Sequence, residues 1–227
     1  MTKNNERAKW TDVENNMWKH SMEREENTKD ECGSSSTSEK IDDSVHEKQC
    51  PQLQNLLVFG DSFALRLCKA VDPSVKGKFN LCQGGMRIND LKHALSNISD
   101  LTLNGKGLLL LVGMNDVLKV KQEDLDGEIF SLISKVLKLN VKMLFLCTLP
   151  ILPGKLNEPI ENFNEEIRDF ESVDENICVV DLEAIFVKED ESTDESFYEK
   201  CHYNDDYDIH PNTKGFQKMA EIILSKL

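Results

Sequence analysis

Four positions far apart in the chain carry the residue types needed for nucleophilic acyl transfer. Ser62 lies in "VFGDSFALRL", Asn115 in "LLLLVGMNDVL" and His210 in "YDIHPN", and paired glycines occupy 84 and 85 in "CQGGMRINDL". A serine hydroxyl becomes a nucleophile when a histidine takes its proton, and amide groups can hold the oxyanion that forms. Each residue alone is also a common cap or turn residue. The chemistry therefore requires a fold that brings the four positions together.

The elements that could position them alternate between short apolar runs and amphipathic stretches. Apolar runs bounded by Gly, Pro, Asp or Asn predict buried strands at 55–60, 79–82, 107–113, 141–150 and 177–182. Apolar residues at helical spacing predict helices at 62–71, 88–98, 125–139, 160–170 and 212–227. Such alternation is typical of an α/β fold with about five parallel strands and helices on both faces. The carboxyl ends of those strands meet at one edge of the sheet, where the four positions would gather.

The first part of the chain has a different composition. Residues 1–52 are polar and acidic without a sustained apolar period, so we predict a disordered tail before a single domain at 53–227. Trp10, Val13 and Met17 have helical spacing, which leaves two alternatives open: a short helix that docks on a protein partner, or an unstructured tail.

Composition bears on the cellular compartment and on the kind of partner that the protein binds. Apolar runs fall short of the ~20 residues that cross a bilayer, and the start lacks an apolar signal-peptide core, which predicts a cytoplasmic or nuclear protein without membrane insertion. Seven cysteines without a CxxC pair fit reduced thiols. The net charge of −14 disfavours RNA as a partner. A basic excess in residues 51–122 keeps RNA binding open.

The motifs resemble those of a known family. "FGDS", the glycine pair, "VGMND" and "IHPN", in that order across about residues 55–227, resemble the four blocks of the SGNH (GDSL-type) hydrolases. The resemblance implies a three-layer α/β/α, flavodoxin-like fold and ester or acyl hydrolysis without a metal or organic cofactor. A small acetyl or short acyl ester is the substrate we expect. It implies Ser62 as nucleophile, His210 as base, and Gly85, or less favourably Gly84, with Asn115 as oxyanion donors. "CQGGMRINDL" is also similar to the esterase-type domain in the first open reading frame of some LINE retroelements.

One position departs from the family pattern. The family places an acid three residues before the histidine, and that position is Tyr207 here. Asp208 is the first candidate for the acid and Asp206 the alternative. Asp208 would need a local turn or bulge to reach the histidine, because one residue of shift in a strand reverses the side-chain direction. A Ser-His pair oriented by a backbone carbonyl is also open.

Two functions of different class follow from these residues. The first is a serine esterase acting on a small neutral or cationic ester, because the acidic loop at 187–206 would repel anions. The second is a catalytically weak or inactive SGNH-like module that acts as a protein- or RNA-binding scaffold.

Overall fold

The structure is a computed structural model that describes residues 51–76, 79–97, 105–119, 122–154, 157–200 and 207–227. Contacts divide the chain into two units at residues 41 and 42, and only the second unit contains described residues. The predicted tail, its proposed docking helix, Asp206 and the side chain of Tyr207 lie outside the description.

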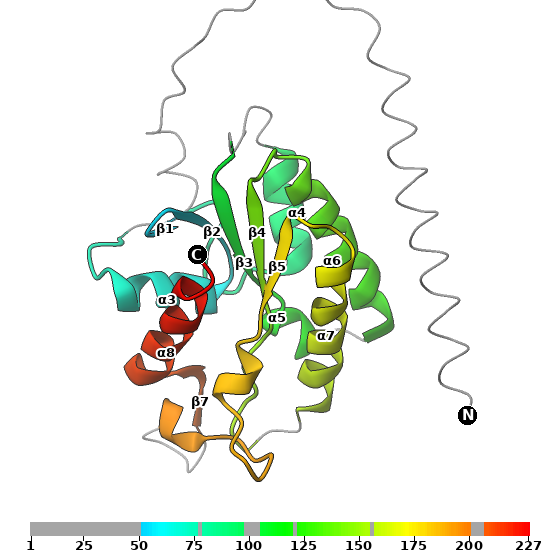
Figure 1. Ribbon diagram of the computed structural model, residues 1–227. Helices are drawn as coiled ribbons and strands as arrows, with labels where there is room; N and C mark the ends of the chain where they lie inside the picture. The colour runs from blue at the N-terminus through cyan, green and yellow to red at the C-terminus, as the bar shows by residue number, and fades with distance from the viewer. Residues whose placement is uncertain (1–50, 77–78, 98–104, 120–121, 155–156, 201–206) are drawn as a thin grey trace, which may run out of the picture. The chain divides into compact units, whose positions relative to one another are not determined.

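A five-stranded, mostly parallel sheet forms the centre of the described domain (Figure 1). Its order is β1-β2-β3-β4-β5, with β2 to β5 parallel and β1 antiparallel to β2. The bounds are Gln52–Leu53 for β1, Leu56–Gly60 for β2, Gly107–Leu111 for β3, Met143–Cys147 for β4 and Ile177–Val180 for β5. The predicted α/β class with a largely parallel sheet is confirmed.

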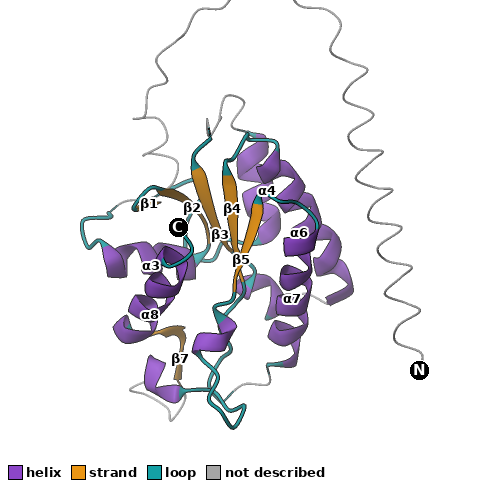
Figure 2. Ribbon diagram, viewed as in Figure 1, coloured by secondary structure: helices purple, strands orange, loops and turns teal. Residues whose placement is uncertain are grey.

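Helices cover both faces of this sheet (Figures 1 and 2). One layer contains α3 and α8, which pack on each other, and the other contains α4, α6 and α7. The bounds are Ser62–Val71 for α3, Ile88–Ser96 for α4, Gln122–Leu137 for α6, Glu158–Asp169 for α7 and Thr213–Leu224 for α8. The four-residue helix α5, Met114–Val117, follows β3 directly. The sheet and its two helical layers give the predicted α/β/α arrangement.

Smaller elements complete the carboxyl-terminal part. Three 3-10 turns lie at Phe170–Ser172, Glu183–Ile185 and Glu195–Phe197, and a two-stranded antiparallel ribbon precedes α8. The ribbon consists of β6, Tyr198–Lys200, and β7, Tyr207–Pro211. His210 therefore lies on a separate ribbon and not on the central sheet.

The strand predicted at 79–82 is wrong. That segment makes only isolated bridges, from Cys82 to Gly60 in parallel and from Cys82 back to Phe79. Because the second bridge closes a tight turn, the segment has no extended run that could pair along β2. It touches only the carboxyl end of β2, and the short antiparallel β1 pairs with the other end of the same edge.

Apolar residues on both faces of the strands make the core. Leu108 to Leu111 are fully buried, as expected for a parallel strand with helices above and below. Burial of one such leucine side chain stabilises the fold by about 1.5–3 kcal/mol. Helix α3 is buried on one face only, with Phe63 and Leu67 in the core and Arg66 and Lys69 exposed.

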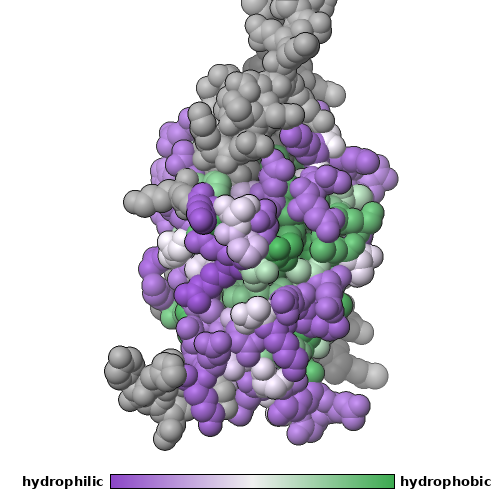
Figure 3. Space-filling model, turned by 90° about the vertical axis from the view of Figure 1, so that its left-hand side faces the viewer, coloured by the Kyte–Doolittle hydropathy of each residue, from purple (hydrophilic) through white to green (hydrophobic). Residues whose placement is uncertain are grey.

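The outer surface on the α3 side is mainly hydrophilic around a smaller hydrophobic area (Figure 3). Among the described residues, the exposed large hydrophobic side chains are Val71, Leu118, Val173 and Leu227. No helix in the described ranges has the length and apolar character needed to cross a membrane.

Candidate active site

A tight turn between β2 and α3 positions Ser62. Gly60 has a φ of 154°, and a Cβ at this position would collide with the Leu111 carbonyl oxygen, so only glycine fits between the two strands. Asp61 caps α3, and its Oδ1 accepts the Phe63 N–H at 2.8 Å. Ser62 is then the first residue of the helix, half-buried at the carboxyl edge of the sheet.

His210 connects Ser62 to a carboxylate. Its Nε2 lies 2.8 Å from Ser62 Oγ, and its Nδ1 lies 3.0 Å from Asp208 Oδ1. An ionised carboxylate only accepts hydrogen bonds, so Nδ1 donates to it and Nε2 is left to accept the serine hydroxyl. Ser62, His210 and Asp208 therefore form one continuous hydrogen-bonded chain.

An irregularity in the ribbon brings Asp208 to the histidine. Tyr198 pairs with Pro211 and Lys200 with Tyr207, so β7 advances four residues where β6 advances two. The extra residues lie between Tyr207 and Pro211. They form the bulge that Asp208 needs in order to reach His210. The same Asp208 oxygen also accepts the His210 backbone N–H at 2.9 Å, which holds the bulge in place.

Burial and charge set the protonation of this pair. Desolvation of the half-buried ring lowers the His210 pKa below 6.5; the hydrogen bond to Asp208 opposes this shift. Phe63 adds an apolar neighbour, with its ring centroid 4.8 Å from that of the imidazole. Burial alone would raise the Asp208 pKa, but the two hydrogen bonds from His210 outweigh it and the pKa lies below its ordinary value. At neutral pH the carboxylate is charged and the imidazole is neutral.

The glycine pair lies beside the nucleophile. Gln83 to Met86 form a turn in which the Met86 N–H donates to the Gln83 carbonyl at 3.3 Å, and Gly85 has a φ of 77°. A Cβ on Gly84 would lie 4.0 Å from Ser62 Cβ, whereas a Cβ on Gly85 would meet nothing within 4 Å. Gly84 therefore lies next to Ser62, while the direction of the two glycine N–H groups, on which the preference for Gly85 depends, is a separate matter. The oxyanion role of either glycine stays a prediction.

Hydrogen bonds to Gly60 position the segment before this turn. The Gly60 N–H donates to Leu81 O at 2.9 Å, and the Gln83 N–H donates to Gly60 O at 3.1 Å. These bonds hold residues 81–83 against the end of β2, so Gly84, the next residue, arrives beside the start of α3.

Asn115 lies on α5, at the end of β3. Its Nδ2 donates to Met86 O at 3.1 Å, which ties α5 to the glycine turn. A side-chain amide has two N–H groups, so one remains for a second acceptor. The side chain is half-buried, and its predicted role as an oxyanion donor is compatible with this position.

Two carboxyl groups beneath the site escaped the sequence interpretation. Asp61 is fully buried with Oδ2 unpaired, and desolvation raises its pKa to about 7. Asp116 accepts the Ile88 N–H at 3.1 Å, and desolvation raises its pKa to about 6. Asp61 directly follows β2, and Asp116 lies five residues after the end of β3, on α5; an acidic residue close behind an apolar strand is the sequence signal that could have identified them.

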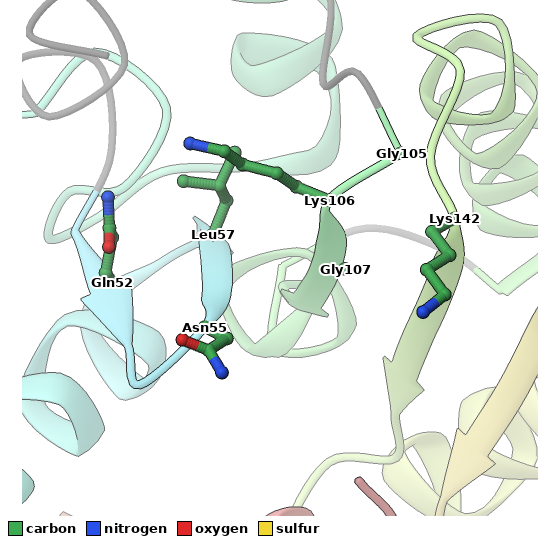
Figure 4. A pocket seen from close by; sticks show the side chains of 7 residues that line it. All are labelled: Gln52, Asn55, Leu57, Gly105, Lys106, Gly107 and Lys142. Carbon is green, nitrogen blue, oxygen red and sulfur yellow. The ribbon is translucent and has the colours of Figure 1, made fainter.

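A pocket of about 290 Å³ lies beside His210, between α3, the β6–β7 ribbon and the start of α8. A larger pocket of about 350 Å³ lies at the opposite end of the sheet, where β3 and β4 begin (Figure 4). Its lining includes Lys106 and Lys142 but no serine, cysteine or histidine, so the larger pocket has no Ser-His or Cys-His pair. Within the described ranges, no group of three metal-ligating side chains could hold a metal ion.

Comparisons with known proteins identify the fold. No family model matches the sequence, and no curated protein matches it. The OSK domain of Drosophila Oskar is similar in structure, with a TM-score of 0.68 and 18% identity over 84% of this chain and 98% of that chain.

Bacterial proteins named as lipases or lipolytic proteins are also similar. A GDSL-like lipase from Bacteroides thetaiotaomicron has a TM-score of 0.56 and 14% identity, over 81% of this chain and 94% of that chain. A putative lipolytic protein of the G-D-S-L family from Desulfitobacterium hafniense has a TM-score of 0.57 and 19% identity, over 75% and 97%. The described domain thus has an SGNH/GDSL hydrolase-like fold. The similarity to retroelement proteins stays a prediction.

Proposed function

We propose that the domain is a serine esterase that cleaves a small ester. The observation that carries this proposal is the hydrogen-bonded chain from Ser62 Oγ through His210 to Asp208, with distances of 2.8 and 3.0 Å. A nucleophile, a base within hydrogen-bond reach and a third group that orients the base are the parts of a serine hydrolase. A scaffold that only binds a partner has no need of all three.

The first half of the reaction forms an acyl-serine. Ser62 Oγ attacks the ester carbonyl carbon while its proton passes to His210 Nε2, which produces an oxyanion and an imidazolium. Asp208 accepts from Nδ1 and stabilises the imidazolium. The Ser62 N–H, the glycine turn and the Asn115 amide are the candidate donors to the oxyanion. The bond to the alcohol oxygen then breaks, and that oxygen takes the proton from Nε2.

The second half releases the acid. Water attacks the acyl carbon and passes a proton to His210 Nε2, and the tetrahedral oxyanion forms again. When this intermediate collapses, Ser62 Oγ leaves and recovers the proton from the ring. The products are one carboxylic acid and one alcohol, and the residues return to their starting protonation.

A fluorophosphonate probe tests the proposal directly, because it labels activated serines covalently. We expect labelling of the wild-type chain and its loss in Ser62→Ala and His210→Ala. Ser225→Ala, which changes an exposed serine at the end of α8, should label like wild type. Equal labelling of wild type and Ser62→Ala would contradict the esterase proposal.

A non-catalytic binding module for RNA or a protein is the second candidate function. The comparisons favour it, because the TM-score to the OSK domain, 0.68, exceeds the 0.56 and 0.57 to the proteins named for lipolysis. The name of the OSK domain refers to no hydrolytic reaction. A folded wild-type chain that resists the probe, yet binds RNA with an affinity that falls as salt rises, would support this candidate over the first.

A further inference from the structure

The pocket beside His210 carries two cationic side chains. Arg66 and Lys69 line it from the exposed face of α3, together with His210 and Asp208 from β7 and with residues at the start of α8. Arg66 follows Ser62 by four residues, about one helical turn. A row of side chains therefore leads along α3 from the nucleophile to the pocket.

Among the described residues, neither cation is held in a direct ion pair. No salt bridge joins Arg66 or Lys69 to a described carboxylate. Two carboxylates line the pocket with them, Asp208 and Glu199. Asp208 is already bound to the imidazole of His210, so among the described lining residues Glu199 is the carboxylate left for the two cations.

The Arg66 charge affects the pKa values of His210 and Asp208. Burial is the main cause of the low His210 pKa, and the Arg66 guanidinium adds to the shift because it repels an imidazolium. The same guanidinium contributes to the lowering of the Asp208 pKa, after the effects of burial and of the His210 hydrogen bonds. A second charge bound near Arg66 would therefore also interact with the base.

In the proposed mechanism, the alcohol portion of the ester lies in the pocket beside His210. His210 protonates the leaving alcohol, so that alcohol must lie against the imidazole. The pocket begins at the same ring, whereas Ser62 is not among its lining residues. The alcohol portion of the ester, rather than the acyl portion, thus extends toward Arg66 and Lys69.

We propose that the substrate is an ester whose leaving alcohol carries a negatively charged group, which Arg66 and Lys69 bind. This inference rests on the proposed esterase function. It replaces the neutral or cationic ester expected from the acidic loop, because among the described residues that line the pocket a cationic alcohol would meet two cations and one available carboxylate. In a chain with a net charge of −14, a local pair of cations also favours the binding of an anion at this pocket.

Two phenyl acetates of the same shape test the charge of the alcohol. The anion 4-acetoxybenzoate and the neutral 4-acetoxybenzamide both release acetate and a phenol and differ in the charge at the far end of the alcohol. Each kcat/KM is divided by the rate of uncatalysed hydroxide hydrolysis of the same ester, because the two substituents also differ in electron withdrawal. We expect wild-type kcat/KM to be about 5-fold or more higher for the anion, given charge-assisted hydrogen bonds at partly exposed cations. The ratio should approach one at high salt, because salt screens exposed charges.

The double variant Arg66→Gln/Lys69→Gln should abolish the preference by lowering kcat/KM for the anion. Lys142→Gln, which removes an exposed charge at the opposite end of the sheet, should retain it. A ratio of kcat/KM (anion over neutral ester) near one in wild type, or an unchanged ratio in the double variant, would overturn the inference about the substrate. Turnover of both esters would still leave the esterase proposal intact. Absence of both turnover and fluorophosphonate labelling would overturn the esterase function itself, and with it this choice of substrate.

Discussion

Asp208 and His210 are two residues apart on one strand, and a single carboxylate oxygen of Asp208 contacts both the ring and the backbone of the histidine. We expect Asp208→Asn to lower kcat/KM by about 10²- to 10⁴-fold, because the amide supplies no charge to stabilise the imidazolium and can favour the wrong tautomer. Steady-state ester hydrolysis measures the loss. Asp190→Asn, at an exposed carboxylate, is the matched control. Full activity in Asp208→Asn would reduce the site to a Ser-His pair.

The protonation of His210 predicts the acid limb of the pH profile. Only the neutral ring can accept the serine proton, and its pKa lies below the ordinary 6.5. We therefore expect kcat/KM to rise with pH through an apparent pKa below 6.5 and to level off before neutrality. Asp208→Asn should move the limb to still lower pH, since Asp208 raises the pKa of the ring. An apparent pKa above 7 would contradict this assignment of the base.

The buried Asp61 predicts a stability that depends on pH. Its pKa is 3.8 when exposed and about 7 in the folded state, so between these values the folded chain holds a proton that the unfolded chain has released. Raising the pH across this window therefore destabilises the fold, by at most roughly 4 kcal/mol for a shift of about 3 units.

Asp61→Asn tests this effect, because the amide oxygen can still cap α3 but carries no charge. Urea unfolding should find the variant more stable than wild type at pH 8, with a gain that shrinks toward pH 4. Asp169→Asn, at an exposed position, should show no such trend. A gain that is equal at both pH values would mean that ionisation of Asp61 is not the cause.

At the level of elements, hydrophobic periodicity predicted most of the structure. The strands at 55–60, 107–113, 141–150 and 177–182 all form, with shorter bounds, because buried parallel strands have a continuous apolar run. The segment 79–82 has a similar composition, but it forms a tight turn in which Phe79 pairs with Cys82. Which apolar run pairs along an edge depends on contacts between distant segments, which composition does not contain.

The same limit applies to the site. Ser62, His210 and Asn115 could be selected because each follows a recognisable element in a recognisable motif. The position of the glycine turn beside Ser62 depends on how residues 81–83 bond to Gly60. The approach of Asp208 depended on the register of β6 against β7. Both are properties of paired backbones, and spacing along one chain does not determine them.

One buried side chain connects α7 to the loop after β4. Asn164 is fully buried; its Oδ1 accepts the Leu149 N–H at 2.7 Å, and its Nδ2 donates to the Leu149 carbonyl at 2.7 Å and to Glu183 at 2.9 Å. We expect Asn164→Ala to destabilise the domain by about 2–4 kcal/mol, because it leaves buried backbone groups unpaired. Denaturant unfolding measures the change. Asn162→Ala, at an exposed position on the same helix, should change stability by less than about 0.5 kcal/mol.

At the level of the whole molecule, one fold is compatible with more than one function. The structural matches include both the OSK domain and proteins named for lipolysis, at identities below 20%. A fold does not determine function, so the discrimination rests on individual side chains at the sheet edge. In this chain those side chains include a serine, a histidine and a carboxylate within hydrogen-bonding distance of one another.

The ribbon of β6 and β7 has a consequence for how such a site could be switched on or off. The acid and the base lie on the same short strand, so they shift as one body when that strand shifts. The serine belongs to a different body, the rigid turn between β2 and α3. Among the described side chains, the hydrogen bond from Ser62 to His210 is the one that crosses between the two. A ligand or partner that moved the ribbon slightly would thus disconnect the nucleophile and leave the acid–base pair intact, and moving the ribbon back would restore it without rebuilding either half.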